Sequence, residues 1–321
     1  MIKKIGLFSA VALVLVWGCG GEEKRDALTA KQWQIISYLP VDTEFLLYMN
    51  LDELRRTEFW EQYFKTSIQK APGNNWLSEF EVQTGIGIKK GIAGIYVATT
   101  WDDNNVFVVQ FSGNIQPVKE YFNNAGYFKP GQVNDKKFYE LKSGSQSKFY
   151  FVDDSTLVVM NSSAYLMSLL EQKRQSLREN TKFVRLIQNI QNKRHYFLVT
   201  DKGSFAAALF GPILGHNKDL PVKEIIGSIT SIHLSAEFDD GVSIESVWEF
   251  NNSKNAYLLA TAIKSAIAVG IFAQKDVTLG KIVEDMTISR YDTKIKFTLE
   301  LEKDKLNEIR HSTLNNKLDL N

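Results

Sequence analysis

The chain contains one thiol, Cys19, whose position gives it the most specific chemistry in the sequence. A single Cys cannot form an internal disulfide or the thiolate cage of a zinc site. It lies at the end of a segment that begins with the basic residues Lys3 and Lys4 and continues as an apolar run from Ile5 to Val16. A basic start followed by a short apolar run is typical of a secretory signal, and the run is too short to cross a bilayer core of ~30 Å. We therefore predict export.

The tetrapeptide Val16-Trp17-Gly18-Cys19 resembles a bacterial lipobox, although Trp17 stands where a small residue is usual. The resemblance implies diacylglyceryl transfer to the Cys19 sulfur, cleavage between Gly18 and Cys19, and acylation of the new amine. Several acyl chains, at ~0.8 kcal/mol per buried CH₂, would attach the protein stably to a membrane. Gly20, and not Asp, follows the Cys. In a two-membrane bacterium this implies an outer-membrane anchor with the body facing the periplasm, and in a single-membrane cell the body would face outward.

Two other interpretations of this N-terminus stay open. One is a cytoplasmic protein whose first helix is buried and carries an inert Cys19, and the other is a cleaved signal without lipid. The flexible, charged segment 20–26 favours the lipid anchor. We assign residues 1–18 to the signal peptide and 19–32 to a lipidated tether.

The four histidines do not form a metal motif. His195, His216, His233 and His311 are far apart, and no pair has the i, i+4 spacing of a zinc-binding helix. Two of them, His195 and His233, fall in predicted strands, where a partly buried and hydrogen-bonded side chain is the expected role.

Nucleophilic and phosphate-binding motifs are missing from the sequence. There is no G-x-S-x-G elbow, and capping of a helix explains Ser204 better than catalysis does. The glycine-rich stretch 85–91 leads into a predicted strand, whereas a phosphate-binding loop would lead into a helix. We predict no catalytic residue and no cofactor.

Three acidic pairs, Asp102-Asp103, Asp153-Asp154 and Asp239-Asp240, could suggest calcium binding or hydrolysis by paired carboxylates. Each pair falls at a predicted hairpin tip, where Asp stabilises the turn through side-chain to backbone hydrogen bonds. Hairpin tips need not converge, so we predict no metal site.

The elements that would position these residues occur twice along the chain. In residues 33–192, alternating apolar runs predict strands at 44–50, 92–100, 106–111, 138–141, 148–152 and 156–160, with helices at 53–68, 76–84, 118–124, 164–173 and 181–190. In residues 193–321, strands are predicted at 195–199, 230–238, 242–250, 286–290 and 294–301, with helices at 254–273 and 303–311.

The spacing of the hairpins predicts a duplication. Ile95 and Ile232 lie 137 residues apart, as do Asp102 and Asp239, and the second hairpin pair is offset by 138. Alternation of apolar and polar residues, as in 295–301, predicts antiparallel sheets with one wet face and helices on the other. The predicted fold class is α+β, with two similar halves, each an antiparallel hairpin-rich sheet with helices on one face.

The segment 256–273 is nearly apolar, which raises the question of a second membrane contact. Lys264 at its centre would be costly in hydrocarbon. Residues Tyr257, Ala260, Ile263, Ile267 and Ile271 recur at helical spacing, which favours a helix packed on the sheet; a peripheral membrane face or a ligand groove stays open as the alternative.

Four segments resemble a group of secreted bacterial lipoproteins of unknown function. They are 39–43, 51–60, 84–88 and 153–159, and the resemblance extends over about residues 35–310. It implies a shared fold and carries no activity.

Composition excludes further classes. With 38 Lys plus Arg against 37 Asp plus Glu, the chain lacks the excess of cations that nucleic-acid binding requires. We therefore expect a lipid-anchored envelope protein with a binding or assembly role and no enzyme activity, attached to the membrane and possessing a protein partner or an apolar ligand. The alternatives are a carrier or sensor of an apolar or peptide ligand between the halves, near 205–215 and 254–273, and a hydrolase with an unrecognised site.

Overall fold

The computed structural model of the chain describes residues 28–64, 75–100, 104–143, 146–171, 175–191, 193–204, 221–270 and 277–309. The first half contains the helices α2 (Ala30–Ile36), α3 (Leu51–Leu54), η1 (Trp60–Phe64), α5 (Asn75–Thr84), α6 (Gln116–Asn124), α7 (Ser163–Leu170), η2 (Leu177–Glu179) and α8 (Thr181–Asn189). Its strands are β1 (Phe45–Asn50), β2 (Ile92–Thr99), β3 (Asn105–Phe111), β4 (Phe128–Val133), β5 (Lys136–Leu141), β6 (Lys148–Phe151) and β7 (Thr156–Met160).

The second half contains five strands and three labelled helices. The strands are β8 (Tyr196–Thr200), β9 (Ile229–Glu237), β10 (Gly241–Phe250), β11 (Met286–Tyr291) and β12 (Lys294–Glu302), and the helices are α10 (Val222–Gly227), α11 (Ser253–Ala268) and α13 (Val277–Glu284). A further helical segment covers 303–309.

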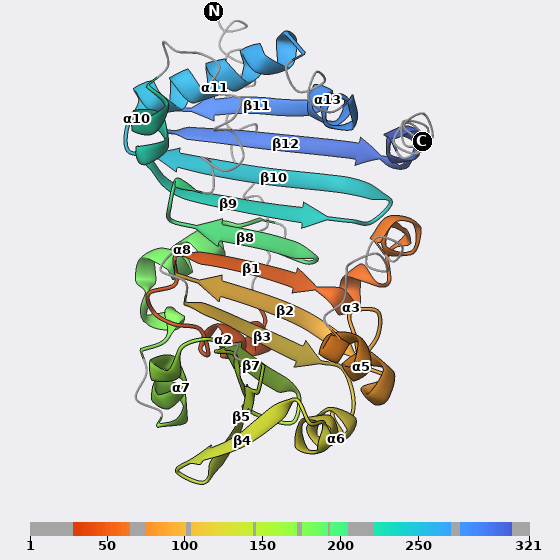
Figure 1. Cartoon of the computed structure of the whole chain (residues 1–321). Helices are drawn as coiled ribbons and strands as arrows, with labels where there is room; N and C mark the ends of the chain where they lie inside the picture. Colours follow the sequence, from red (N-terminus) through yellow and green to blue (C-terminus); the bar gives the residue numbers. More distant parts are fainter. Residues whose placement is uncertain are drawn as a thin grey trace, which may run out of the picture.

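All twelve strands belong to one antiparallel sheet, in the order β11-β12-β10-β9-β8-β1-β2-β3-β7-β6-β5-β4 (Figure 1). The α+β class with two similar halves is thus confirmed, because the order β1-β2-β3-β7-β6 is repeated as β8-β9-β10-β12-β11. The sequence suggested a separate sheet for each half, and this prediction is wrong. The two halves join edge to edge through β1 and β8.

The junction strands pair symmetrically. Phe45 lies opposite Thr200 and Met49 opposite Tyr196, with Leu47 opposite Leu198 midway. An antiparallel pair centred in this way relates the halves by an approximate two-fold axis perpendicular to the sheet. The boundary between residues 192 and 193 stays a prediction. By position, α8 belongs to the second half, because it precedes β8 as α2 precedes β1. By packing, however, α8 belongs to the core of the first half.

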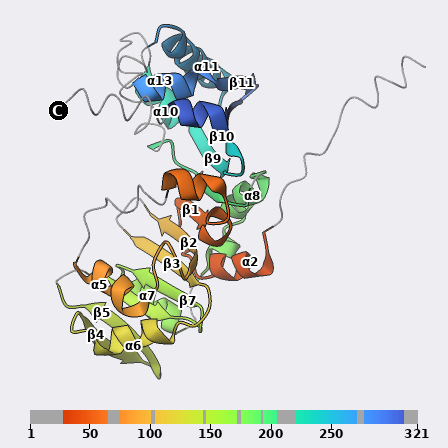
Figure 2. The same ribbon diagram turned by 90° about the vertical axis from the view of Figure 1, so that its right-hand side faces the viewer.

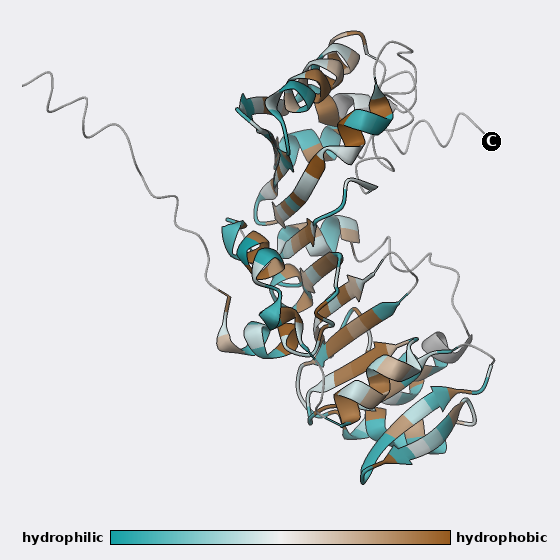
Figure 3. Ribbon diagram, turned by 90° about the vertical axis from the view of Figure 1, so that its left-hand side faces the viewer, coloured by the Kyte–Doolittle hydropathy of each residue, from teal (hydrophilic) through white to brown (hydrophobic). Residues whose placement is uncertain are grey.

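Helices cover both faces of the sheet in the first half, which corrects the expectation of one covered face. We call face A the side to which Tyr96 and Val108 point, where α2, α7 and α8 pack, and face B the opposite side, where α3, η1 and α6 pack. Figure 2 shows α2 and α8 on one side of the strands and α5 and α6 on the other. Apolar residues on both sides of β2 and β3 explain this, and Figure 3 colours the central strands of this half mainly as hydrophobic.

In the second half the described helices pack on face B. Ile232, Trp248, Ile295 and Phe297 lie under α10 and α11 in one hydrophobic cluster. The alternate residues of β10 and β12 point to face A and include Glu245, Glu249, Lys294 and Lys296. The predicted arrangement, with helices on one side and polar residues on the other, therefore holds for β10 and β12, whereas face A of β8 and β9 is buried and contacts α8.

In the first half, helix α2 was not predicted and a second helix differs from its prediction. α2 begins at Ala30, inside the segment assigned to the tether, because Thr29 and Gln32 form a capping box there. The helix predicted over 53–68 is instead the four-residue α3, whose N-cap is Asn50, followed by a turn and η1. The part of the predicted helix beyond Phe64 lies outside the described residues.

Strand β4 was not predicted, because Pro130 and Gly131 interrupt its pattern. Pro is tolerated there since β4 is an edge strand, where a missing N–H leaves no ladder partner unsatisfied. The β4–β5 turn places Asn134 and Asp135 at positive φ, of 48° and 62°, as a tight hairpin turn requires.

The apolar segment 254–273 forms α11 up to Ala268, packed on the sheet as predicted. The buried stripe is Ala256, Leu259, Ala260, Ile263 and Ala266, so Tyr257, which the sequence placed in the stripe, is 55% exposed instead. Ile271 lies outside the described residues. Among the described residues, no helix is both long and apolar enough to span a bilayer.

Candidate functional site

The two halves meet a second time beside one end of the central strands. Here α3 and η1 of the first half approach the β9–β10 turn and the helical segment 303–309 of the second half. The rings of Phe59 and Phe238 lie 4.7 Å apart between centroids, and the Tyr63 hydroxyl donates to Asn307 Oδ1 at 2.7 Å.

Ion pairs surround this aromatic contact. Lys303 Nζ lies 2.7 Å from Glu58 Oε1, and this hydrogen bond raises the pKa of the Lys303 ammonium. Arg194 Nη1 lies 3.0 Å from Asp239 Oδ1, and its Nε lies 3.6 Å from Glu53 Oε2. The pairs of Lys303 with Glu58 and of Arg194 with Glu53 each join one half to the other, so the halves are held together by more than the β1–β8 ladder.

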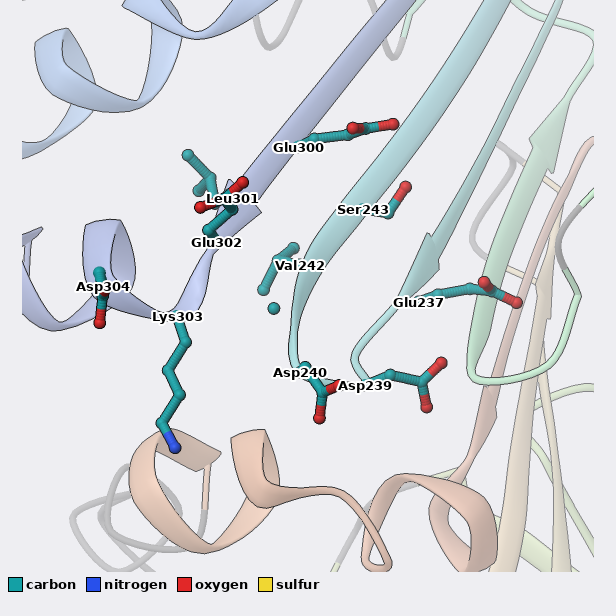
Figure 4. A pocket seen from close by; sticks show the side chains of 11 residues that line it. Glu237, Asp239, Asp240, Val242, Ser243, Glu300, Leu301, Glu302, Lys303 and Asp304 are labelled. Atoms are coloured by element: carbon teal, nitrogen blue, oxygen red, sulfur yellow. The ribbon is translucent and has the colours of Figure 1, made fainter.

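An open cleft of about 550 Å³ begins at this junction and is lined by the β9–β10 turn, the paired ends of β10 and β12, and the first residues of the helical segment that follows β12 (Figure 4). Its polar lining is Glu237, Asp239, Asp240, Ser243, Glu300, Glu302, Lys303 and Asp304, and its apolar lining is Val242 and Leu301, with Gly241 at the turn. Six carboxylates thus face one ammonium, and that ammonium is paired with Glu58. The cleft therefore has a negative electrostatic potential that favours cationic groups.

Gly241 shapes one wall of the cleft. A Cβ built on this residue would lie 2.4 Å from the Leu301 carbonyl oxygen, which is backbone and cannot move aside cheaply. Only glycine allows β10 to approach β12 this closely at the turn. The close approach fixes Asp239 and Asp240 relative to Glu302.

His195 is fully buried beside the junction. Its Nδ1 accepts a hydrogen bond of 3.0 Å from the Phe238 backbone N–H, so the neutral ring carries its proton on Nε2. Burial, and then the positive charge of Arg194, lowers the pKa of His195 below its usual value of 6.5. His195 is hydrogen-bonded as predicted but fully rather than partly buried, and it connects the start of β8 to the end of β9.

The acidic pairs do not converge. Asp153 Oδ1 accepts from the Ser155 backbone N–H at 2.8 Å, which is the turn-stabilising role predicted for it, and Asp154 pairs with Lys119 at 2.6 Å. Asp239 and Asp240 line the cleft in the second half. Asp102 and Asp103 lie outside the described residues. Within the described ranges, no group of three or more His, Cys, Asp and Glu side chains is arranged to hold a metal ion.

The remaining candidates from the sequence are dispersed. The glycine-rich turn has Gly85 and Gly91 at positive φ and leads into β2, as predicted. Ser204 is exposed at the end of a described range. Gly18 and Cys19, the predicted cleavage and lipidation residues, lie outside the described residues together with His216 and His311.

Sequence reasoning did not single out Glu58, Arg194 or Lys303. Their partners lie 245 positions away for Lys303 and 45 for Arg194, and an ordinary surface charge has no local pattern that marks such a pairing. The acidic turn 239–240 was the one part of the cleft that the sequence drew attention to.

No protein-family model matches the chain, and no curated protein matches it. Similar solved structures include two crystal forms of the protein TP0453, each at 9% sequence identity. Form I matches over 86% of this chain and 96% of that chain with a TM-score of 0.47, and form IV over 84% and 95% with a TM-score of 0.48. The function of the chain therefore has to be derived from its own residues.

Proposed function

We propose that this chain is a lipid-anchored protein of the bacterial envelope with a non-catalytic binding or assembly role. The observation that carries the proposal is the N-terminal arrangement of Lys3 and Lys4, a short apolar run and Gly18-Cys19. This order supports export and acylation of the Cys19 sulfur. In a two-membrane cell, Gly20 after the Cys supports an outer-membrane anchor facing the periplasm.

The anchor would keep the folded body close to the lipid surface. The helix α2 begins at Ala30, soon after Cys19 along the chain. At ~3.6 Å per extended residue, the connection spans at most ~40 Å. A partner of the body would therefore be bound within reach of the membrane.

The acidic cleft supports a role in binding. Its six carboxylates favour a partner with lysine or arginine side chains, and Val242 and Leu301 offer some apolar contact. Its open shape suits a segment of another protein better than a small enclosed substrate.

The test of the anchor is Cys19→Ala in the full chain, followed by membrane fractionation. We expect the wild-type protein in the membrane fraction and the variant in the soluble fraction, because the acyl chains are the attachment. Trp17→Ala serves as the matched control, since it leaves the thiol and restores a small residue beside it; we expect it to stay on the membrane. Retention of Cys19→Ala on the membrane, or an unmodified thiol at Cys19 by mass spectrometry, would contradict the proposal.

The second candidate function is a carrier or sensor of a ligand between the halves. Residues 205–215, which were expected to line such a groove, lie outside the described residues, and α11 packs on the sheet of the second half. The described cleft is acidic, which favours a basic peptide over an apolar ligand. A ligand co-purifying with the chain in native mass spectrometry would distinguish this function from assembly with a protein. The hydrolase alternative would require turnover that is lost in single-residue variants of the cleft.

A further inference from the structure

The two ends of the twelve-stranded sheet differ in how they are protected. Strand β4 ends the sheet in the first half and contains exposed Lys129 and Pro130. A charged residue and a proline on an edge strand discourage pairing with another chain. Strand β11 ends the sheet in the second half with the sequence Met286 to Tyr291, which has no proline and one formal charge.

The internal repeat shows what the β11 position accommodates. Strand β6 occupies the equivalent place in the first half, and it pairs on its outer side with β5, antiparallel, with Tyr139 opposite Phe149. In the second half the connection between β10 and β11 contains α11 and α13 in place of an added hairpin. Among the described residues, no strand therefore pairs with the outer side of β11.

The charges around β11 are complementary to those of a second, antiparallel β11. Glu284 and Asp285 precede the strand and are exposed, and Arg290 lies near its end and is also exposed. Antiparallel pairing of two copies brings the acidic start of each strand beside the basic end of the other. Opposite charges on neighbouring strands stabilise such a pair, whereas like charges destabilise it.

Several registers satisfy a two-fold axis, and the one centred on Thr287 brings the opposite charges together. It places Met286 opposite Ile288 and Asp285 opposite Ser289 of the other copy, with Glu284 beside Arg290. Paired residues then point to the same face in both copies, as a continuous sheet requires. No two like charges oppose each other along the six residues of the strand.

Aromatic side chains flank the same edge. Tyr291 is 65% exposed and Tyr257 of α11 is 55% exposed, and the Arg290 guanidinium lies 5.7 Å from the Tyr257 ring centroid. Exposed tyrosines beside an arginine are enriched in protein interfaces. The junction of β1 with β8 shows that two equivalent strands of this fold can meet in this antiparallel manner.

We propose that two copies of this chain associate through β11, as a symmetric dimer in which the sheet continues from one copy into the other. The self-complementary charges of segment 284–290 commit the edge to a second copy. An extended segment of a different protein is the competing occupant.

The test is a charge swap in the full lipidated chain, extracted in a mild detergent and measured by light scattering at several concentrations. Arg290→Glu brings two acidic side chains together at each end of the paired strands, and Glu284→Arg brings two basic side chains together there. We expect the wild type to be dimeric, and we expect the dissociation constant of the dimer to be at least ten-fold higher in each variant. An equimolar mixture of the two variants should recover the dimer, because opposite ends then meet again.

Gln132→Glu on β4 is the matched control, since it changes the charge of the other edge, and we expect it to stay dimeric. Circular dichroism verifies that all variants are folded. A monomeric wild type over the whole concentration range would overturn the proposal and leave β11 to a strand of another protein. Dimers that persist equally in both single variants would also overturn it, because the contact would then lie elsewhere.

Discussion

The two halves share one strand order but treat face A in opposite ways. In the first half, face A is apolar, with residues such as Tyr96, Val108 and Val158 under α2, α7 and α8. In the second half, the same face of β10 and β12 presents Glu245, Glu249, Lys294 and Lys296. The comparison shows that the strand ladder defines the architecture, whereas the side chains facing each side decide whether helices settle on it.

The charged face is organised across neighbouring strands. Lys294 lies opposite Glu249 with 2.5 Å between Nζ and Oε1, and Lys296 Nζ lies 2.9 Å from Glu245 Oε2. Such cross-strand pairs keep a polar face in register. They also give β10 and β12 a polar surface on face A, whereas the same face of the first half is apolar and buried.

The largest expected effect is a truncation on face A of the first half. Phe183 of α8 is 1% exposed and packs in the core against the sheet. Phe183→Ala should lower the free energy of unfolding by about 3–5 kcal/mol, from lost burial and the cavity left behind. Urea unfolding monitored by circular dichroism measures it. Lys182→Ala on the same helix, 61% exposed, is the control. Equal losses for both would mean that α8 does not hold down face A.

A smaller effect on stability is expected at the junction between the halves, where the pH dependence of unfolding reports on His195. Its pKa is lower in the folded chain than the usual 6.5, so the unfolded chain takes up the proton first as the pH falls. The contribution of His195 to the free energy of unfolding should therefore be fully present above about pH 6.5. It should decline as the pH falls below this value, until the lowered pKa of the folded chain has been passed. Unfolding midpoints measured from about pH 8 to pH 5 follow this decline.

The control for the pH effect is His195→Gln. Its side-chain oxygen can still accept from the Phe238 N–H, and it does not titrate in this range. We expect a shallower decline of stability with acidification in this variant. A slope identical to that of the wild type would show that groups other than His195 cause the pH dependence.

The smallest effect is expected on face A of the second half. Lys294 and Glu249 have side chains 51% and 25% exposed, and exposed pairs of this kind contribute about 0.2–1 kcal/mol. A double-mutant cycle with Lys294→Ala and Glu249→Ala isolates the coupling, which should weaken in high salt. A coupling of ~3 kcal/mol or more would indicate a desolvated pair, and hence a face that is covered like its counterpart.

Much of the sheet was predictable because period-two patterns and turn residues are local signals. The β2–β3 and β9–β10 hairpins and the helices α6 and α8 lie where the apolar spacing placed them. Strand β4 escaped prediction, since Pro130 is acceptable only at an edge, and edge position is a property of the assembled sheet. The short α3 differs from the predicted long helix because the chain turns at Thr57, whose hydroxyl donates to the Leu54 carbonyl and accepts from the Trp60 N–H.

By itself, the sequence determined most of the strands, their turns and the repeated order, and it predicts a lipobox around Cys19, because each depends on residues that are close together in the chain. Only the tertiary structure decided that β1 and β8 fuse the halves into one sheet, that Lys303 reaches Glu58, and that the acidic turn at Asp239 faces the end of β12. These depend on contacts between distant segments, which arise when the whole sheet assembles and buries its apolar faces. No local pattern records them.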